Sequence, residues 1–555
     1  MKSSKTVALG TIVAIAFLAA HAVQAHPVTV DGMATEWSTR QPNGDNLGIV
    51  ARDLSQQGEY IWRDAAADTR TDIATPETVA DLTEVQITGS ALGLSFLITL
   101  NVSVAVPLNP VQVQIAIDTD RFPGSGQTFF AGFADTSVAF DAAWEYLIQT
   151  RLTAGPQAVV LDPTFAQVGA PVPVALGGGA GSNPVLEFTV PWAQLGYLLP
   201  PTNAPLRFTI ATFREQIGGN TIDIGGLAVS NALDALTDYG APDATPPHPG
   251  TWVEVSDTIV DYNFDVWFSG RGEVYPPLMI VRYVSNATPD AAGGDEWIAI
   301  RNMTPVSLLL DRYRLGDEET ALGTGEAMQS FPTGINLAAG AVLIASHSAT
   351  NFNGRYGTLP DVQWTAGGMG VPVMTTYAPW SAGAGGIALN NGADEILILD
   401  RSHTAVDIVT YGAASGYAGV VQMPAPAAGA VAARNAFFTD RDDCALDFTR
   451  GTICVVDADC GGCGQCVVHA CFTRAAGTVC RAAADVCDMG ETCDGTALTC
   501  PTDVFLPSTT VCRTSAGACD VVESCTGSAA ACPVDAFLPG TTECRGSAGA
   551  CDVAE

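Results

Sequence analysis

Sixteen cysteines are the side chains of this sequence most able to do chemistry, and all of them lie between Cys444 and Cys551. Thiols form disulfides, bind metal ions or act as nucleophiles, depending on compartment and spacing. From Cys480 onward, successive cysteines are 7, 6, 7 and 12 residues apart, and this series recurs with a period of 32 residues. A fixed period is typical of a repeated structural unit.

The N-terminal residues indicate the compartment in which these cysteines are located. Lys2 and Lys5 precede the apolar run from Val7 to Ala20, and small residues up to Ala25 offer a cleavage site. This pattern predicts a secretory signal peptide over residues 1–25, because the apolar run is too short for a membrane span. No later segment is long and apolar enough to cross a bilayer, so we expect a secreted or cell-surface protein.

Secretion and cysteine density together predict disulfides, although the spacing does not specify which cysteine pairs with which. We expect all sixteen to take part: Cys444, Cys454, Cys460, Cys463, Cys466, Cys471, Cys480, Cys487, Cys493, Cys500, Cys512, Cys519, Cys525, Cys532, Cys544 and Cys551. A zinc site is the alternative for Cys460, Cys463, Cys466 and His469, which are spaced by three residues. An oxidising compartment favours the disulfides.

Composition excludes other classes of function. The chain has 555 residues, of which 24 are basic and 58 acidic, giving a net charge of −34 that repels the phosphates of nucleic acids and acidic membranes. The sequence contains no HExxH, GxSxG, phosphate-loop or GxGxxG motif, and no carboxylate pair with the spacing of a glycoside hydrolase. We therefore predict no catalytic residue.

The elements that must position any site are predicted to be β-strands. Period-two alternation over 92–100, 111–117 and 186–190 is typical of half-buried antiparallel strands, and almost no stretch has a sustained helical period. Apolar residues make up 47% of the chain, which is enough to form the hydrophobic cores of folded domains. The expected fold class is all-β: a jelly-roll-like β-sandwich over 26–270, an immunoglobulin-like sandwich over 276–412, a linker over 413–443, and disulfide-rich repeats over 444–555.

The first sandwich opens with VTVDGMATEW over Val28 to Trp37, and "iDtD" and "iPxxxLG" patterns follow at 117–120 and 190–196. These motifs resemble those of family-nine-like carbohydrate-binding modules and their DOMON-like relatives. The resemblance implies an extracellular polysaccharide or surface glycan as the partner, and a structural calcium. Sugar rings stack on aromatic faces. We take Trp62, Trp144 and Tyr146 as candidates for that role, with core packing as the alternative, and we assign Trp37 to the core.

Calcium requires six to eight oxygen ligands, so carboxylates must converge from several loops. Asp64, Asp68, Asp118 and Asp120 are the candidate ligands. The alternative is that these acids are solvated turn residues, which are common in so acidic a chain.

The second sandwich carries DEWIAIRN over 295–302, LLDRYRLGD over 309–317 and AVDIVTYG over 405–412. These strings, in this order, resemble the lamin-tail domain, although Arg282 and Tyr283 replace the family's usual acidic residue. The resemblance implies an immunoglobulin-like accessory domain without a catalytic centre.

The cysteine repeats read CRxxxxxCDxxExC, and they resemble the C-terminal half of the disintegrin domain, without an Arg-Gly-Asp loop. The third copy stops at Glu555, before its next cysteine, and we expect the sequence to be a fragment.

The function expected from these features is a non-catalytic binding or adhesion protein that recognises extracellular carbohydrate, with other surface proteins as further partners and no nucleic acid. The alternative is an extracellular metal-dependent hydrolase, or an accessory subunit of one, whose catalytic part is unrecognised or lies past residue 555.

Overall fold

The computed structural model describes residues 28–42, 48–64, 69, 80–101, 111–132, 134–153, 155–178, 183–216, 220–222, 230–236, 258–285, 296–318, 326–365, 368–381, 386–413, 417–435 and 438–554. The predicted signal peptide lies outside these residues. The described part is nearly all β, with a disulfide-rich C-terminal segment, and this confirms the predicted fold class. Among the described residues, no helix is long and apolar enough to cross a membrane.

One long sheet runs through the body of the molecule and contains eleven strands. Its order is β10 (Ala175–Gly177), β11 (Val185–Pro191), β4 (Gly93–Leu100), β3 (Leu82–Gly89), β2 (Gly58–Arg63), β1 (Gly48–Arg52), β27 (Ala405–Gly412), β26 (Ala393–Leu399), β20 (Arg314–Gly316), β21 (Met328–Ser330) and β25 (Thr375–Thr376). The N-terminal and middle segments, expected as two separate sandwiches, therefore contribute to one sheet. They meet where β1 pairs in parallel with β27 through Ile49 and Ala405.

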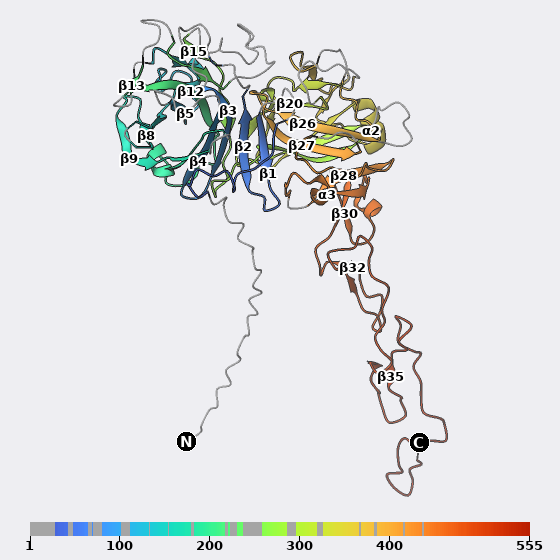
Figure 1. Ribbon diagram of the computed structural model, residues 1–555. Coiled ribbons are helices and arrows are strands. Elements are labelled where there is room, and N and C mark those ends of the chain that lie inside the picture. The colour runs from blue at the N-terminus through green and yellow to red at the C-terminus, as the bar shows by residue number, and fades with distance from the viewer. Residues whose placement is uncertain are drawn as a thin grey trace, which may run out of the picture.

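Two further sheets pack against the two halves of the long sheet (Figure 1). The eight-stranded sheet covers the N-terminal half and consists of β13 (Asn220–Thr221), β12 (Leu206–Gln216), β5 (Val111–Asp118), β7 (Tyr146–Arg151), β8 (Gln157–Leu161) and β9 (Gln167–Pro173), with β14 (Asp234–Ala235) and β16 (Phe264–Val266) pairing with β12. The six-stranded sheet covers the other half and consists of β24 (Val362–Gln363), β23 (Val342–Ser346), β18 (Trp297–Asn302), β17 (Leu278–Val284), β28 (Ala430–Arg434) and β29 (Phe448–Thr452). We call these halves the first and second sandwich.

A single apolar core runs between the sheets, from Ile49 in β1 to Phe448 in β29. The outer faces of the smaller sheets are buried as well, because loops cover the first, while α2 (Ala349–Tyr356) and the cysteine-rich segment cover the second. The strands in these sheets therefore have two buried faces. In β5, expected to be half exposed, Gln112 and Gln114 are fully buried and the Gln114 Nε2 donates to the Gln112 Oε1 over 2.8 Å.

The segment 413–443, expected to be a linker, instead belongs to the second sandwich. It supplies β28, whose Arg434 is buried and donates hydrogen bonds to the carboxylates of Asp407 and Asp440. The following short helix α3 (Cys444–Asp447) leads directly into β29. Alanine-rich composition suggested a linker, but small side chains also suit a strand that is packed on both faces.

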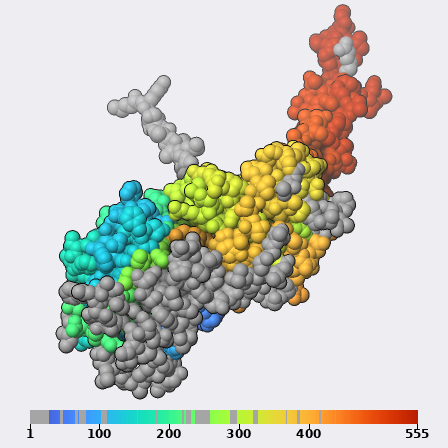
Figure 2. Space-filling model, turned by 90° about the horizontal axis from the view of Figure 1, so that it is seen from above, coloured from blue at the N-terminus to red at the C-terminus, as the bar shows by residue number. Residues whose placement is uncertain are grey.

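The cysteine-rich segment leaves the second sandwich as a narrow projection, and it is drawn in brown to red in Figures 1 and 2. It consists of three two-stranded units: β30 (Gly464–Val467) with β31 (Ala470–Thr473), β32 (Val479–Arg481) with β33 (Glu491–Thr492), and β34 (Val511–Arg513) with β35 (Glu523–Ser524). Its repeated Arg and Glu residues form ion pairs at matching places, Arg481 with Glu491 and Arg513 with Glu523. Short elements with little apolar core depend on such links and on disulfides.

The remaining short elements lie in the connections. They are two small β-pairs, β6 (Ser137–Val138) with β15 (Ile259–Val260) and β19 (Leu308–Leu309) with β22 (Asn336–Leu337), and the 3-10 helices η2 (Phe140–Ala142), η3 (Trp192–Leu195), η4 (Leu310–Arg312) and η5 (Asp457–Cys460).

Candidate functional site

Two of the three aromatic side chains expected to hold sugars are in the core. Trp62 and Trp144 are both 0% exposed, so neither ring offers a face to a ligand, and the expectation is corrected for both. Trp62 packs against Tyr262 and Phe264 inside the first sandwich, and Trp144 lies under the loops that cover the eight-stranded sheet. Tyr146, at the start of β7, remains partly exposed.

Two of the four expected calcium ligands lie together. Asp118 ends β5, Asp120 lies in the turn that follows, and Glu145 directly precedes β7, which pairs with β5. Because the end of β5 and the start of β7 are neighbours, the carboxylates of these three residues come together, with one oxygen from each within 4.8 Å of the others. Asp64 lies at the end of β2 in the other sheet, and Asp68 lies outside the described residues.

The surroundings of this acidic cluster keep one carboxylate oxygen free of hydrogen bonds. The Glu145 Oε2 accepts from the Thr119 amide over 2.8 Å, whereas the buried Oε1 has no hydrogen-bond partner among the described residues. Burial, and after it the nearby Asp120 and Asp118 carboxylates, raise the pKa of Glu145, and burial also raises the pKa of Asp118. A Cβ at Gly126 would lie 2.3 Å from the Trp144 carbonyl oxygen, and the φ of this residue is +82°, so the loop requires glycine where it passes beside Glu145. Such a cluster favours a bound cation or a proton.

The opening motif of the first sandwich converges on one carboxylate. Glu187 in β11 is fully buried, and it accepts hydrogen bonds from the Asp31 and Gly32 amides and from the Trp37 Nε1, each over 2.8 Å. Through these hydrogen bonds, the residues of the motif VDGMATEW hold the N-terminal segment against β11. Trp37 is 3% exposed, as expected of a core residue.

A pocket of about 340 Å³ opens beside this anchored segment. Its wall includes Trp37 and a set of polar side chains from the N-terminal segment, β1 and β2: Glu36, Ser38, Thr39, Arg52, Asp53, Gln57 and Glu59. Glu59 is 4% exposed, and one of its oxygens accepts from the Ser38 amide over 2.9 Å. Burial raises the pKa of Glu59 to about 8, with smaller contributions from Asp53 and Glu84. At neutral pH this carboxyl can therefore both donate and accept a hydrogen bond.

A second polar pocket, of about 370 Å³, lies where β2 and β4 end and β3 begins. Asp64 lines it together with Arg63, Thr83, Glu84, Thr99, Asn101 and Asn183. No aromatic side chain belongs to this lining, so this pocket lacks the apolar surface against which a sugar ring packs.

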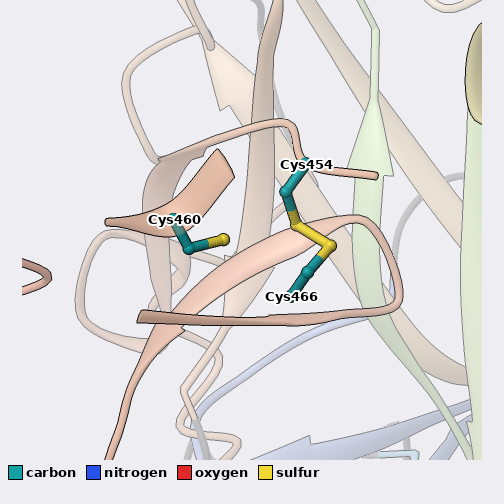
Figure 3. Close-up of side chains that lie close together, drawn as sticks. All are labelled: Cys454, Cys460 and Cys466. Atoms are coloured by element: carbon teal, nitrogen blue, oxygen red, sulfur yellow. A yellow bond between two sulfur atoms is a disulfide. The ribbon is translucent and has the colours of Figure 1, made fainter. Parts of the chain in front are cut away.

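The cysteines suited to zinc by spacing are all in disulfides. The bonds are Cys454–Cys466, Cys460–Cys471, Cys463–Cys493, Cys480–Cys500, Cys487–Cys525, Cys512–Cys532 and Cys519–Cys544. The sulfurs of Cys454, Cys460 and Cys466 lie within 4.8 Å of one another, and Figure 3 shows the Cys454–Cys466 disulfide beside the side chain of Cys460, which bonds Cys471. His469 instead packs against the Tyr356 ring of α2, with ring centroids 4.1 Å apart.

Two cysteines do not form the disulfides expected of all sixteen. Cys444 is buried in the core of the second sandwich, where burial raises the pKa of its thiol to about 12, and Cys551 is exposed near the end of the third copy. Cys444 thus acts as a small apolar core side chain.

Sequence reasoning missed the glutamates that organise both candidate sites. Glu145 stands between Trp144 and Tyr146, and Glu59 stands three residues before Trp62, but only the aromatic residues were taken as candidates. Only the strand pairing brings Glu145 beside Asp118, and only the fold of the N-terminal segment brings Glu59 beside Trp37.

Comparison with known proteins adds little to this geometry. No family model matches the chain, so the three family resemblances stay predictions. Among solved structures, the chain is similar to a DUF4876 family protein from Bacteroides thetaiotaomicron, with 13% sequence identity and a TM-score of 0.27 over 50% of this chain and 90% of that one. A similarity at this level carries no argument about function.

Proposed function

We propose that this protein is an extracellular binding protein whose first sandwich recognises a glycan at the Trp37–Glu59 pocket. The observation that carries the proposal is the composition of that pocket. Hydrogen-bonding side chains of the N-terminal segment, β1, β2 and the turn between these strands line one concavity of about 340 Å³, where the Trp37 ring itself is buried. Its volume is within the range of small-molecule sites, and polar groups that converge in a pocket of this size can bind the hydroxyl groups of a sugar.

The chemistry of Glu59 supports a ligand rich in hydroxyl groups. With its pKa near 8, the carboxyl is protonated at neutral pH and offers a donor and an acceptor together. Arg52 and Gln57, which carry N–H donors, line the same pocket. A ligand that carries many hydroxyls, each able to donate and accept, fits this set better than an anion or an apolar molecule does.

The remaining architecture supports display outside the cell. Seven disulfides cross-link the C-terminal projection, and disulfides persist in oxidising compartments. The projection extends away from the two sandwiches (Figure 2), as a stalk that carries a binding head does. We therefore propose secretion or surface display, with adhesion to glycan-bearing surfaces as the outcome of binding.

Binding of the full chain to a glycan array and to insoluble polysaccharides tests this proposal. We expect retention on at least one glycan, and loss of retention in Gln57→Ala and Glu59→Gln, which alter the pocket without removing core side chains. Gln167→Ala, at an exposed position on β9, is the matched control and should bind as the native chain does. No retention on any glycan, or equal retention by all variants, would overturn the proposal. Cleavage of a retained glycan would instead support the alternative of a hydrolase.

We further propose that calcium binds at Asp118, Asp120 and Glu145 and stabilises the first sandwich. The free Glu145 Oε1 and the shared space of three carboxylates support this assignment over solvated turn residues. In this proposal calcium has a structural role, because the cluster does not line the Trp37–Glu59 pocket.

A further inference from the structure

The hairpin formed by β30 and β31, where the projection meets the second sandwich, closes through an unusual two-residue turn. Val467 pairs with Ala470, so Val468 and His469 are the two central residues, and their φ angles are +45° and +58°. Both angles lie in the left-handed region, where turns of this kind usually place asparagine and glycine. A β-branched residue such as Val468 rarely adopts it. Contacts outside the hairpin must therefore hold this turn in its strained conformation.

His469 supplies such contacts. Its ring lies among three aromatic side chains of the second sandwich, with centroid distances of 4.1 Å to Tyr356 and 5.4 Å to Phe352, both in α2, and 6.1 Å to Trp297 in β18. The Nδ1 atom lies 3.1 Å from the Cys454 carbonyl oxygen. Because a carbonyl oxygen only accepts, Nδ1 carries a proton and donates this hydrogen bond. The neutral ring therefore satisfies Nδ1 and packs the rest of its surface against aromatic carbon.

Arg282 in β17 places a positive charge near the same ring. It is 3% exposed, its Cζ lies 4.9 Å from the centroid of the Phe472 ring, and its Nε has no hydrogen-bond partner among the described residues. Within the described part of the chain, no carboxylate pairs with Arg282, although the sequence has 58 acidic residues. A buried guanidinium without a counter-ion opposes any further positive charge beside it.

The other charged groups around the His469 ring belong to α2 and β18. On α2, the Cζ of Arg355 lies 5.9 Å from the centroid of the Tyr356 ring, and the Tyr356 hydroxyl accepts from an indole N–H. On β18, Arg301 lies over a phenylalanine ring. Glu296, which directly precedes β18, accepts from the Leu389 amide, in a loop of the second sandwich. The charges that face the ring are therefore those of arginines.

These surroundings favour the neutral form of His469. Burial lowers the pKa of its imidazole, the Cys454 carbonyl opposes this shift, and Arg282 adds to it. Aromatic faces attract cations, but a protonated ring would lose its hydration beside a guanidinium that has no counter-ion. The packed position is therefore available to the neutral ring and disfavours the charged one.

We propose that His469 is an acid-sensitive switch at the junction between the projection and the second sandwich. The neutral ring packs among the aromatic side chains of α2 and β18 and holds the strained turn. Protonation drives the ring out into solvent, the turn relaxes, and the angle between the projection and the sandwiches is no longer fixed. The packing is fully present above the ordinary histidine pKa of 6.5, and it is lost as pH falls through the lower pKa of the folded state. This switch does not depend on what the first sandwich binds.

Titration of His469 in the full chain is the first test. Histidines labelled with carbon-13 at Cε1 are followed by NMR, and the signal that is missing in His469→Gln assigns the residue. We expect a pKa below 6.5 in the native chain and a higher pKa in Arg282→Gln, where the repelling charge is removed. Arg271→Gln removes an exposed arginine of the first sandwich and is the matched control, which should keep the native value. A pKa of 6.5 or above in the native chain would overturn the inference.

Small-angle X-ray scattering of the full chain tests release of the projection and does not rely on Arg282→Gln folding. Between pH 7.5 and pH 5 we expect the distribution of interatomic distances to broaden, and to return when neutral pH is restored. His469→Gln, uncharged at both pH values, should lose this dependence on pH. His347→Gln, which changes another histidine of the second sandwich, should respond as the native chain does. An unchanged distribution in the native chain, or equal broadening in His469→Gln, would contradict the switch.

Discussion

At the scale of single residues, the carboxylates of this acidic chain differ in what surrounds them. Glu187 accepts from three N–H donors, Glu59 is buried and accepts from the Ser38 amide, and Glu145 shares its space with two other acids. A buried carboxylate requires donors or cations to stay ionised. We therefore expect Glu145 to respond to calcium and Glu59 to respond to pH.

Calcium should raise the thermal midpoint of the full chain. Binding to the folded state alone stabilises it by about 2.7 kcal/mol at a calcium concentration a hundredfold above the dissociation constant. Differential scanning calorimetry with calcium and then with a chelator measures the shift, and Glu145→Gln with Asp120→Asn should abolish it. Glu84→Gln alters a carboxylate outside the cluster and should leave the shift intact. An unchanged midpoint after chelation would remove the calcium site.

Glu59 should make the chain less stable as pH rises toward 8. Burial raises its pKa from 4.5 to about 8, so between these values the folded chain holds a proton that the unfolded chain has released. Stability from this group is thus fully present below about pH 4.5 and is lost as pH rises through about 8, by on the order of a few kcal/mol. Urea unfolding at pH 5 and pH 8 should show a smaller decline in Glu59→Gln than in the native chain.

Other buried acids contribute to the same decline, so the comparison between variants isolates Glu59. Burial also raises the pKa values of Asp317 and Asp400 to about 6, and both remain in Glu59→Gln. Gln57→Ala changes the same pocket without removing an acid and should keep the native slope. Equal slopes in the native chain and Glu59→Gln would show that Glu59 is ionised in the folded state.

At the scale of strands and sheets, local pattern predicted where the strands lie but not which faces they bury. The alternation over 111–117 correctly placed β5, yet Gln112 and Gln114 are buried because loops cover the outer face of the sheet. For Trp62 and Trp144 the sequence left open sugar binding or core packing, and the fold decides for the core, between the sheets for Trp62 and under the loops for Trp144. The pairing of Ile49 with Ala405 joins residues far apart in sequence, and no local signal specifies it.

The seam between the sandwiches depends on an ion network around Asp265 at β16. Arg121 and Arg207 of the first sandwich and Arg401 of the second all pair with this carboxylate. Although burial opposes ionisation, these arginines hold the pKa of Asp265 well below its usual range. Without Asp265, three arginine side chains would lie close together with little solvent around them. Because these arginines belong to both sandwiches, we expect the loss of Asp265 to destabilise both.

We expect Asp265→Ala to lower the free energy of unfolding by about 3–5 kcal/mol, as is usual when one partner of a buried ion pair is removed. Asp141 is the matched control, because it pairs with Arg207 and Arg401 but its side chain is 46% exposed. Asp141→Ala should cost at most about 1 kcal/mol. Calorimetry should show the two sandwiches of Asp265→Ala melting together at a lower temperature. Equal losses in the two variants would contradict a central role for Asp265.

At the scale of the whole molecule, the two parts are stabilised by different interactions. The sandwiches share one continuous core and contain no cysteine before Cys444, whereas the projection has seven disulfides and few buried side chains. The parts meet where His469 and Ala470 pack against the aromatic residues of α2 and β18. This contact is made by the first two-stranded unit of the projection. The repeats that begin at Cys480 lie beyond this unit.

Reduction should therefore unfold the projection and leave the sandwiches folded. A disulfide restricts the unfolded chain by about 2–4 kcal/mol, and units with so little core lose their main source of stability when it is cut. In dithiothreitol we expect trypsin to cleave rapidly after Arg481 and Arg513, while the near-ultraviolet circular dichroism of the buried tryptophans and the main thermal transition stay unchanged. Alkylated, unreduced protein is the control for modification of Cys551. Loss of the main transition on reduction would show instead that the sandwiches depend on the projection, and would count against an independent binding head.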